Sequence, residues 1–331
     1  MSVNTLLQAQ DVRAYYKLGK IFVKAVDGVS FEIFEDEVVG VVGESGCGKS
    51  TLSNVLFMNI NRPLTLIGGK IFFKSNGQTW EMSALSREEV KKKLWGKEIS
   101  IIPQSAMNAL MPTIRIETYI QHLAESHGIS EKELLAKAKE RFQEVGLDLK
   151  WLKRYPFELS GGMKQRAVIA IATLLNPKLL IADEPTSALD VVNQKVFLKV
   201  LMKMKRQGII RSIFFITHDI ATVRQIADRM MIMYAGKIVE ISPMNKILEK
   251  PLHPYSQGLL NSVLTPEPEV KKRGIVVIPG APPNLVDPPT GCRFHPRCPY
   301  AMDICVKQEP ALVEIEPNVR VACFLYTGEK A

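Results

Sequence analysis

The sequence has few cysteines, few aromatic residues and no long apolar run. Its 331 residues include five cysteines, and aromatic residues make up 7% of the chain. No apolar run reaches the roughly 18 residues that a membrane-spanning helix needs, so we expect no transmembrane segment. The start, MSVNTLLQAQDVRAYY, lacks the basic-then-apolar order of a secretory signal. These absences favour a chain that stays in the cytoplasm.

The composition predicts a folded chain with an excess of positive charge. Hydrophobic residues make up 46% of the sequence, which is enough for a large core, and the length favours about two domains. The net charge of +9 favours anionic partners such as nucleotides, nucleic acids or an anionic membrane surface. Solvated lysine-rich helices would give the same charge, so charge alone leaves the partner open.

The strongest motif follows an apolar run at residues 38–42. The run VVGVV predicts a buried parallel strand, and the next residues, GESGCGKS, match the phosphate-binding pattern G-x-x-x-x-G-K-[ST]. Glycines let consecutive backbone N–H groups turn inward around phosphates, and the helix predicted from TLSNVLFM would point its N-terminus at the anion. Lys49 is expected to reach the β- and γ-phosphates, and the Ser50 hydroxyl to bind Mg²⁺. Cys47 is interpreted as a small filler in this loop.

Two further motifs predict a metal site and a second anion site. The apolar run LLIAD ends in Asp183, and Glu184 follows it; adjacent carboxylates at a strand end suit a Mg²⁺ ligand and a base that polarises water. Ser160 and two glycines open the predicted helix MKQRAVIAIATLL, whose N-terminus would bind an anion. One nucleotide does not need two anion sites in one chain. The sequence therefore predicts a dimer in which each chain's second site covers the partner's nucleotide.

Six segments together resemble the ABC-type ATPase family. They are GESGCGKST, IIPQSA, LSGGMKQR, LLIADEP, SALD and FFITHD, and they occur in the family's order between residue 5 and about residue 245. The resemblance implies an α/β fold with a P-loop (RecA-like) nucleotide-binding core, an antiparallel β subdomain and a helical subdomain at about 106–165. It also implies an ATPase that uses ATP and Mg²⁺.

The resemblance implies a role for individual residues. Glu184 would act as the base, His218 would contact the γ-phosphate, and Gln104 would touch Mg²⁺ and link the site to a membrane partner. Tyr16 would stack on adenine, with Tyr15 as the near alternative. The other residues expected to contact the nucleotide or Mg²⁺ in the same chain are Gly43, Ser45, Gly46, Gly48, Lys49, Ser50, Thr51 and Asp183.

The same resemblance assigns three residues to the dimer. Ser160 and Gly162 would contact the γ-phosphate bound to the other subunit, and Asp190 would lie at the interface. Only one P-loop and one signature segment occur, which weighs against translation-type members with two cassettes and chromosome-maintenance members with a long coiled coil. We therefore expect a transport ATPase and no nucleic-acid partner; a nucleic-acid-associated ATPase stays as a remote alternative that rests on charge alone.

The composition changes after residue 245 and becomes rich in proline. We expect residues 1–245 to form the ATPase domain and residues 246–331 a loop-rich extension. HPYSQGLLNSV and GCRFHPRC resemble the extension of the oligopeptide/dipeptide importer ATPases, and HPYSQGLL with SAMNALMP is more similar to the D-type subunit than to its F-type companion.

This second resemblance implies the assembly around the chain. An F-type ATPase chain would complete a heterodimer, two membrane permease subunits would be driven by it, and an extracellular binding protein would deliver di- or oligopeptides. The chain would then lie at the cytoplasmic face of the cell membrane. Similar sequences also serve oligosaccharides and nickel, so these substrates remain alternatives.

Four of the five cysteines lie in the extension. In a reducing cytosol, clustered cysteines indicate metal binding rather than disulfides. Their spacing lacks the tight C-x₂₋₄-C pair of structural zinc sites, whereas four loosely spaced thiolates can hold a [4Fe–4S] cluster, which the resemblance to D-type members also implies. Zinc with His295 as a spare ligand, and thiols without metal, remain open. The four predicted cluster ligands are Cys292, Cys298, Cys305 and Cys323.

Overall fold

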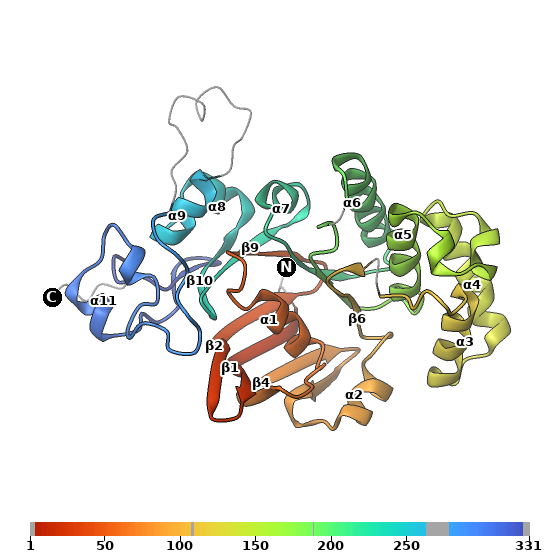
Figure 1. Ribbon diagram of the computed structural model, residues 1–331, viewed down its shortest axis with the longest axis horizontal. Helices are drawn as coiled ribbons and strands as arrows, with labels where there is room; N and C mark the ends of the chain where they lie inside the picture. Colours follow the sequence, from red (N-terminus) through yellow and green to blue (C-terminus); the bar gives the residue numbers. More distant parts are fainter. Residues whose placement is uncertain (1–3, 107–108, 188, 263–277, 327–331) are drawn as a thin grey trace. The chain divides into compact units, whose positions relative to one another are not determined.

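The computed structural model describes residues 4–106, 109–187, 189–262 and 278–326. The chain forms two compact units, whose elements Figure 1 labels. The first unit comprises Met1–Leu6, Phe34–Asp36 and Phe73–Ile216, and the second comprises Leu7–Ile33, Glu37–Phe72 and Thr217–Ala331. This division does not follow the expected boundary at residue 245, which stays a prediction.

The first unit contains a parallel sheet with the strand order β6–β7–β8. Every residue of β7 and β8 is buried, as is typical of parallel strands covered on both faces, and β7 is the strand predicted from the apolar run LLIAD. The register pairs Ile102 of β6 with Ala182 of β7, and Asp183 of β7 with Ile216 of β8. The unit's strands are β5 (Gln78–Glu81), β6 (Ile99–Ile102), β7 (Leu179–Asp183) and β8 (Ser212–Ile216).

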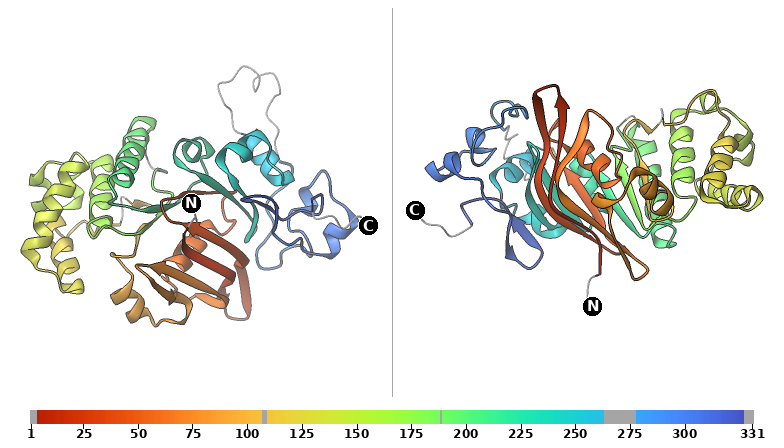
Figure 2. Two further views of the ribbon diagram at one scale, coloured as in Figure 1. Left: turned by 180° about the vertical axis from the view of Figure 1, so that it is seen from behind. Right: turned by 90° about the horizontal axis from the view of Figure 1, so that it is seen from below.

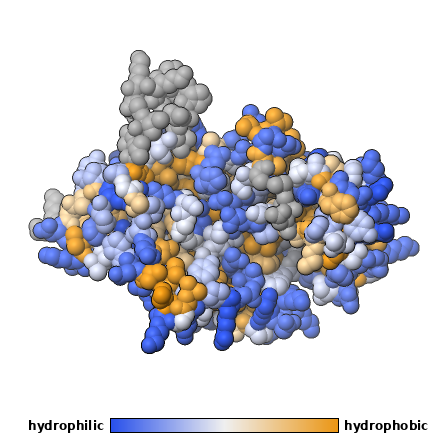
Figure 3. Space-filling view, viewed as in Figure 1, coloured by the Kyte–Doolittle hydropathy of each residue, from blue (hydrophilic) through white to orange (hydrophobic). Residues whose placement is uncertain are grey.

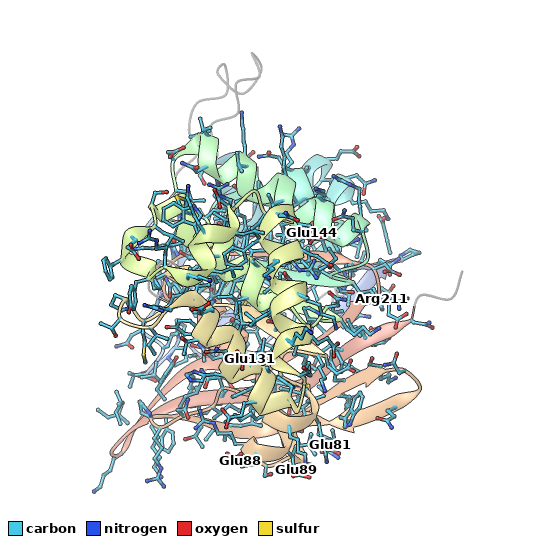
Figure 4. The ribbon with its side chains drawn as sticks, turned by 90° about the vertical axis from the view of Figure 1, so that its right-hand side faces the viewer. Glu81, Glu88, Glu89, Glu131, Glu144 and Arg211 are labelled. Atoms are coloured by element: carbon cyan, nitrogen blue, oxygen red, sulfur yellow. The ribbon has the colours of Figure 1, made fainter. Side chains whose placement is uncertain are left out.

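Helices make up most of the rest of the first unit. Leu134, Ala138 and Phe142 form the buried stripe of α4, at the spacing of one helix face. Helix α4 packs against α3 and α5, and Figure 4 shows Glu131 and Glu144 at its opposite ends. The unit's helices are η1 (Met82–Ala84), α2 (Arg87–Lys93), α3 (Ile116–His127), α4 (Glu131–Glu144), η3 (Leu149–Lys153), η4 (Pro156–Glu158), α5 (Gly161–Ala172) and α6 (Val191–Arg206).

The second unit contains two groups of strands. The long strands β1 (Thr5–Leu18) and β2 (Ile21–Phe34) are neighbours and run antiparallel because a two-residue turn joins them; β4 (Leu64–Ser75) lies next to β1 (Figure 2). The other group begins with β3 (Val38–Val42), which pairs in parallel with β9 (Arg229–Tyr234). This arrangement confirms the expected buried strand at residues 38–42.

The C-terminal extension continues this second group of strands. Strand β9 forms an antiparallel hairpin with β10 (Lys237–Pro243) through a turn at Ala235 and Gly236. Strand β10 then pairs with β12 (Val319–Val321), and β12 with β11 (Val313–Glu316), both antiparallel. The tail therefore adds two strands that its proline-rich composition did not predict. The helices of this unit are α1 (Lys49–Leu56), α7 (Ile220–Ile226), α8 (Met244–Glu249), α9 (Pro254–Asn261), η5 (His295–Arg297) and α11 (Asp303–Lys307).

Several large apolar side chains are exposed at the surface. In the view of Figure 3, separate orange patches lie within a largely hydrophilic surface. Among the exposed apolar residues are Met111, Phe157, Val191 and Val192, which are 62%, 63%, 65% and 71% exposed. All four belong to the first unit.

Close packing of β3 against α7 generates the first prediction. A Cβ atom at Gly40 would lie 2.1 Å from Cγ1 of Val223, so we expect Gly40→Ala to lower the free energy of unfolding by about 1–3 kcal/mol through overpacking. Gly68 of β4 has no atom within 4 Å of such a Cβ, and Gly68→Ala is the matched control with a change of about 0.5 kcal/mol or less. Urea unfolding measures both variants, and equal losses would contradict the packing argument.

Candidate functional site

The loop between β3 and α1 is shaped by two glycines that lie under backbone carbonyls. A Cβ atom at Gly43 would lie 2.2 Å from the carbonyl oxygen of Met233, and one at Gly48 would lie 2.0 Å from that of Ala25. Gly48 also has a φ of 110°, which residues with side chains rarely adopt. Only glycine fits at either position, and the loop can therefore turn its N–H groups toward a phosphate.

Lys49 is held inside this loop. Its side chain is buried, and its Nζ atom donates to the carbonyl oxygens of Gly43 and Glu44 at 2.8 and 2.9 Å. Cys47 is also buried, with its sulfur 3.8 Å from the same Nζ atom, and burial raises the pKa of its thiol. A neutral, enclosed thiol fits the interpretation of Cys47 as a filler.

The two neighbouring tyrosines of β1 have different surroundings. The Tyr16 hydroxyl lies 3.1 Å from the Thr51 hydroxyl at the start of α1, which brings the ring next to the phosphate loop. The Tyr15 hydroxyl donates to Asp27, and burial with this carboxylate raises the pKa of Tyr15 to about 12. Tyr15 therefore belongs to a polar cluster on β2, whereas Tyr16 faces the loop.

His218 lies at the same sheet edge as the phosphate loop in the second unit. The N–H of Thr217 donates to the carbonyl of Val41 at 3.1 Å, so the chain leaves the sheet beside β3. His218 is exposed, and the next residue, Asp219, caps α7 by accepting the N–H of Ala221. The cap fixes the backbone on the C-terminal side of His218.

The first unit brings Gln104, Asp183 and Glu184 to one sheet edge. Because Ile102 pairs with Ala182, the residues that follow β6 and β7 leave the sheet together. Asp183 is buried, and Gln104 is exposed in the turn after β6. Carboxylate and amide oxygens at one edge are suitable Mg²⁺ ligands. Ser50, the third predicted ligand, is the second residue of α1.

Glu184 has a strained backbone. Its φ is 45°, in the left-handed region that residues other than glycine rarely occupy. Its N–H donates to the carbonyl of Ile216 at 2.8 Å, and its carbonyl accepts both the N–H and the hydroxyl of Ser187. Backbone strain held in place by surrounding hydrogen bonds is common at catalytic positions.

The second anion site opens helix α5. Ser160 is the N-cap, and its side chain accepts the N–H of Met163 at 3.4 Å, which confirms the predicted cap. A Cβ atom at Gly162 would lie 3.0 Å from Oδ1 of Asn193 in α6. Asp190 caps α6 through the N–H groups of Val192 and Asn193 at 2.9 Å each, and these hydrogen bonds lower its pKa.

Gln165 is a site residue that the sequence reasoning missed. Its side chain is buried, and Nε2 donates to the carbonyl of Pro185 at 2.8 Å, directly after Glu184. Helix α5, which carries the predicted second anion site, is therefore tied to the segment that carries the predicted base. The signal was a polar residue on the buried face of α5, next to Ala167, Val168 and Ile169.

The four cysteines of the extension line one small cavity. His253 and His295 line it as well, and all four thiols are free of disulfides. The N–H groups of Phe294, Tyr300 and Leu325 donate to the sulfurs of the cysteines two positions earlier, as often occurs around cysteine ligands of metals. Burial raises the pKa of Cys292 to about 12 and that of Cys323 to about 11, so without a cation these thiols are neutral.

A site for a single metal ion is not found here. Within the part of the chain that the structure describes, no three His, Cys, Asp or Glu side chains are placed to hold one ion. The four cysteines line a common cavity. No metal-binding arrangement is therefore found among these described side chains, and both the [4Fe–4S] cluster and zinc stay predictions.

Comparison with known proteins identifies the family. A model described as ABC transporter matches residues 26–187, and one described as Oligopeptide/dipeptide transporter, C-terminal region, matches residues 239–305. The first match includes the phosphate loop and the Asp183–Glu184 pair, and the second includes the first three cysteines of the extension.

The relatives match this chain over nearly its whole length. It is 39% identical to the dipeptide transport ATP-binding protein DppD of Caldanaerobacter subterraneus subsp. tengcongensis over 98% of each chain. It is 41% identical to the oligopeptide transport ATP-binding protein AppD of Bacillus subtilis over 99% of each, and 39% identical to AppF of the same organism over 98% of each. A solved dimeric ATP-binding cassette in a post-hydrolysis state with ADP and phosphate has 25% identity and a TM-score of 0.62, over 72% of this chain and 99% of that one.

The chain belongs to the ATP-binding proteins of ABC transporters, in the group that carries the oligopeptide/dipeptide transporter C-terminal region. It is an ATP-hydrolysing enzyme, and the predicted α/β P-loop fold is confirmed. Among the described residues, no helix has both the length and the hydropathy that crossing a bilayer requires.

The contrast between Tyr16 and Tyr15 generates the second prediction. If the Tyr16 ring stacks on adenine, we expect Tyr16→Ala to weaken MgATP binding about 10-fold and Tyr16→Phe to leave it nearly unchanged. Tyr15→Phe is the matched control, because it removes only the hydrogen bond to Asp27. Titration calorimetry measures the three dissociation constants. Weaker binding with Tyr15→Phe and normal binding with Tyr16→Ala would reverse the assignment.

Proposed function

We propose that this chain powers an importer of di- or oligopeptides as its D-type ATPase subunit. The proposal rests on two features of one chain. Glu184 follows β7 with a φ of 45°, and the extension matches the oligopeptide/dipeptide transporter region. Relatives named for dipeptide and oligopeptide transport support this substrate class. Oligosaccharides and nickel are the alternative substrates.

Each predicted residue has a role in hydrolysis. The N–H groups of the phosphate loop and Lys49 bind the phosphates, and Ser50, Gln104 and Asp183 would hold Mg²⁺, which neutralises phosphate charge. Glu184 accepts a proton from the attacking water, and His218 contacts the γ-phosphate. The remaining loop residues, which position the nucleotide, are Gly43, Ser45, Gly46, Gly48 and Thr51.

The second anion site acts on the partner subunit's nucleotide in this proposal. Ser160 is exposed at the N-terminus of α5, where its helix dipole favours an anion. Val191 and Val192, 65% and 71% exposed, follow Asp190 and would be covered by the other ATPase chain. We propose an F-type chain as this partner, because the resemblance to D-type subunits implies a heterodimer with an F-type chain.

The membrane partners would contact the first unit. Gln104 and Met111 lie on the segment between β6 and α3, and Met111 and Phe157 are exposed apolar residues suited to a permease surface. Two permease subunits and an extracellular binding protein complete the proposed importer. The chain would work at the cytoplasmic face of the cell membrane as a peripheral subunit.

The third prediction tests the role of Glu184. In the assembled transporter, we expect Glu184→Gln to lower ATP turnover at least about 100-fold, because the amide cannot accept the proton of the attacking water. ATP should still bind and should hold the two ATPase chains together. Glu131→Gln, on α4, is the control with normal turnover. Hydrolysis by Glu184→Gln at the wild-type rate would reject Glu184 as the base.

We further propose that Cys292, Cys298, Cys305 and Cys323 hold a [4Fe–4S] cluster. The four thiols around one cavity, of which those of Cys305 and Cys323 are buried, and the N–H donors to three of the sulfurs support this ligand set. A bound cluster supplies positive charge that keeps the sulfurs deprotonated. Its role here would be structural, because it would join the chain on both sides of α11 within a proline-rich extension.

The fourth prediction is the metal content of the chain. Anaerobic purification should give about four iron and four acid-labile sulfide per chain, with a brown colour and absorbance near about 400 nm. Cys298→Ser should lower both iron and sulfide, whereas Cys47→Ser is the matched control with unchanged content. One zinc per chain without sulfide would reject the cluster in favour of zinc, with His295 as the spare ligand. Absence of both iron and zinc would mean that the thiols carry no metal.

A further inference from the structure

Glu44, the second residue of the phosphate loop, is tied to the C-terminal extension. Its two carboxylate oxygens accept from the two terminal nitrogens of Arg297 at 2.8 and 2.9 Å, a bidentate pair. Its backbone N–H donates to the hydroxyl of Tyr255 at 2.9 Å. Its carbonyl oxygen accepts from Lys49 Nζ at 2.9 Å. The carboxylate, N–H and carbonyl groups of Glu44 are therefore all held, two of them by the extension.

Arg297 is itself firmly placed. It is 8% exposed, and its Nε atom donates to the carbonyl of Pro279 at 2.7 Å. Its guanidinium also donates to the hydroxyl of Tyr234 at 3.2 Å and lies 5.7 Å from the centre of that ring. An arginine buried in this way needs a carboxylate partner, and Glu44 supplies it. Loss of Glu44 would leave the buried guanidinium without a compensating charge.

Tyr255 is held in place by ring packing and by hydrogen bonds. Its ring is fully buried and packs against Tyr234 and Phe294, with ring centres 4.5 and 5.4 Å apart. The backbone N–H of Tyr255 donates to Nδ1 of His253. The backbone N–H of His253 donates to the buried carboxylate of Glu240 in β10. The histidine and tyrosine of the HPY segment therefore form a chain of hydrogen bonds from β10 to the phosphate loop.

We propose that Arg297 and Tyr255 are positioning residues for ATP binding. They hold Glu44, and the carbonyl of Glu44 in turn holds Lys49, so the extension sets the shape of the loop before the nucleotide arrives. Without these contacts the loop must be ordered when ATP binds, which weakens affinity. The chemical step is assigned to Glu184, which these contacts do not touch, and its rate should change little. This inference goes beyond the proposed transport function and holds whether or not the cysteines carry a cluster.

The test is steady-state ATP hydrolysis by the assembled transporter. We expect Arg297→Gln to raise the KM for ATP about 10-fold and to change kcat less than about 2-fold, since a charge-assisted pair is lost outside the reacting atoms. Arg297→Lys should recover part of the loss because it keeps the charge. Tyr255→Phe keeps the packed ring, removes only the partner of the Glu44 N–H, and should raise KM about 3-fold.

A matched control and a double variant separate positioning from general stability. Arg320→Gln breaks another arginine–carboxylate pair between the extension and β2, to Glu32 at 3.3 Å, and should leave KM unchanged. Glu44→Gln combined with Arg297→Gln should raise KM no more than the larger single change, because the two residues act as one pair. Iron content measured on the same samples separates this effect from loss of a cluster.

Three results would overturn the proposal. One is an unchanged KM in both Arg297→Gln and Tyr255→Phe, even with a lower melting temperature, because that would limit these residues to fold stability. Another is an equal rise of KM in Arg320→Gln. The third is an additive rise in the double variant, which would mean that Glu44 and Arg297 act independently.

Discussion

The need to keep a phosphate loop open, with its N–H groups turned inward, constrains the rest of the second unit. Lys49 Nζ binds the carbonyls of Gly43 and Glu44 within the loop, and the other contacts that shape it come from outside. Gly43 and Gly48 lie against the carbonyls of Met233 and Ala25, which brings β9 and β2 into contact with the loop. Glu44 is then fixed from the extension by Arg297. The loop is held by neighbours on several sides, and a side chain at either glycine would remove that support.

The sequence predicted best what local patterns determine. The strands at 38–42 and 179–183, both predicted from apolar runs, are fully buried. Ser160 was recognisable as a cap because a serine followed by two glycines opens an apolar helix. In these cases the residues that decide the structure lie within about ten positions of each other, so the pattern contains the answer.

The features that the sequence did not predict depend on contacts between distant residues. Glu44 and Arg297 are 253 positions apart, and nothing in either segment signals the partner. The pairing of β12 with β10 also joins the tail to a strand more than 70 residues earlier, against its loop-like composition. The left-handed backbone of Glu184 was not predicted either, because glutamate has no preference for it and the surrounding hydrogen bonds impose it.

The extension is therefore better understood as part of the nucleotide-binding unit than as an appendage. Strand β12 pairs with β10, Arg293 pairs with Asp27, and Arg297 pairs with Glu44, and each of these contacts lies within the second unit. Arg297 lies in the short helix η5, between Cys292 and Cys298. The N–H of His295 donates to the carbonyl of Cys292, and the N–H of Cys298 donates to the carbonyl of His295. Whatever fixes the two cysteines also fixes the arginine. A metal bound by these cysteines would then also affect the geometry of the phosphate loop, which gives a physical reason for joining a cysteine-rich extension to an ATPase.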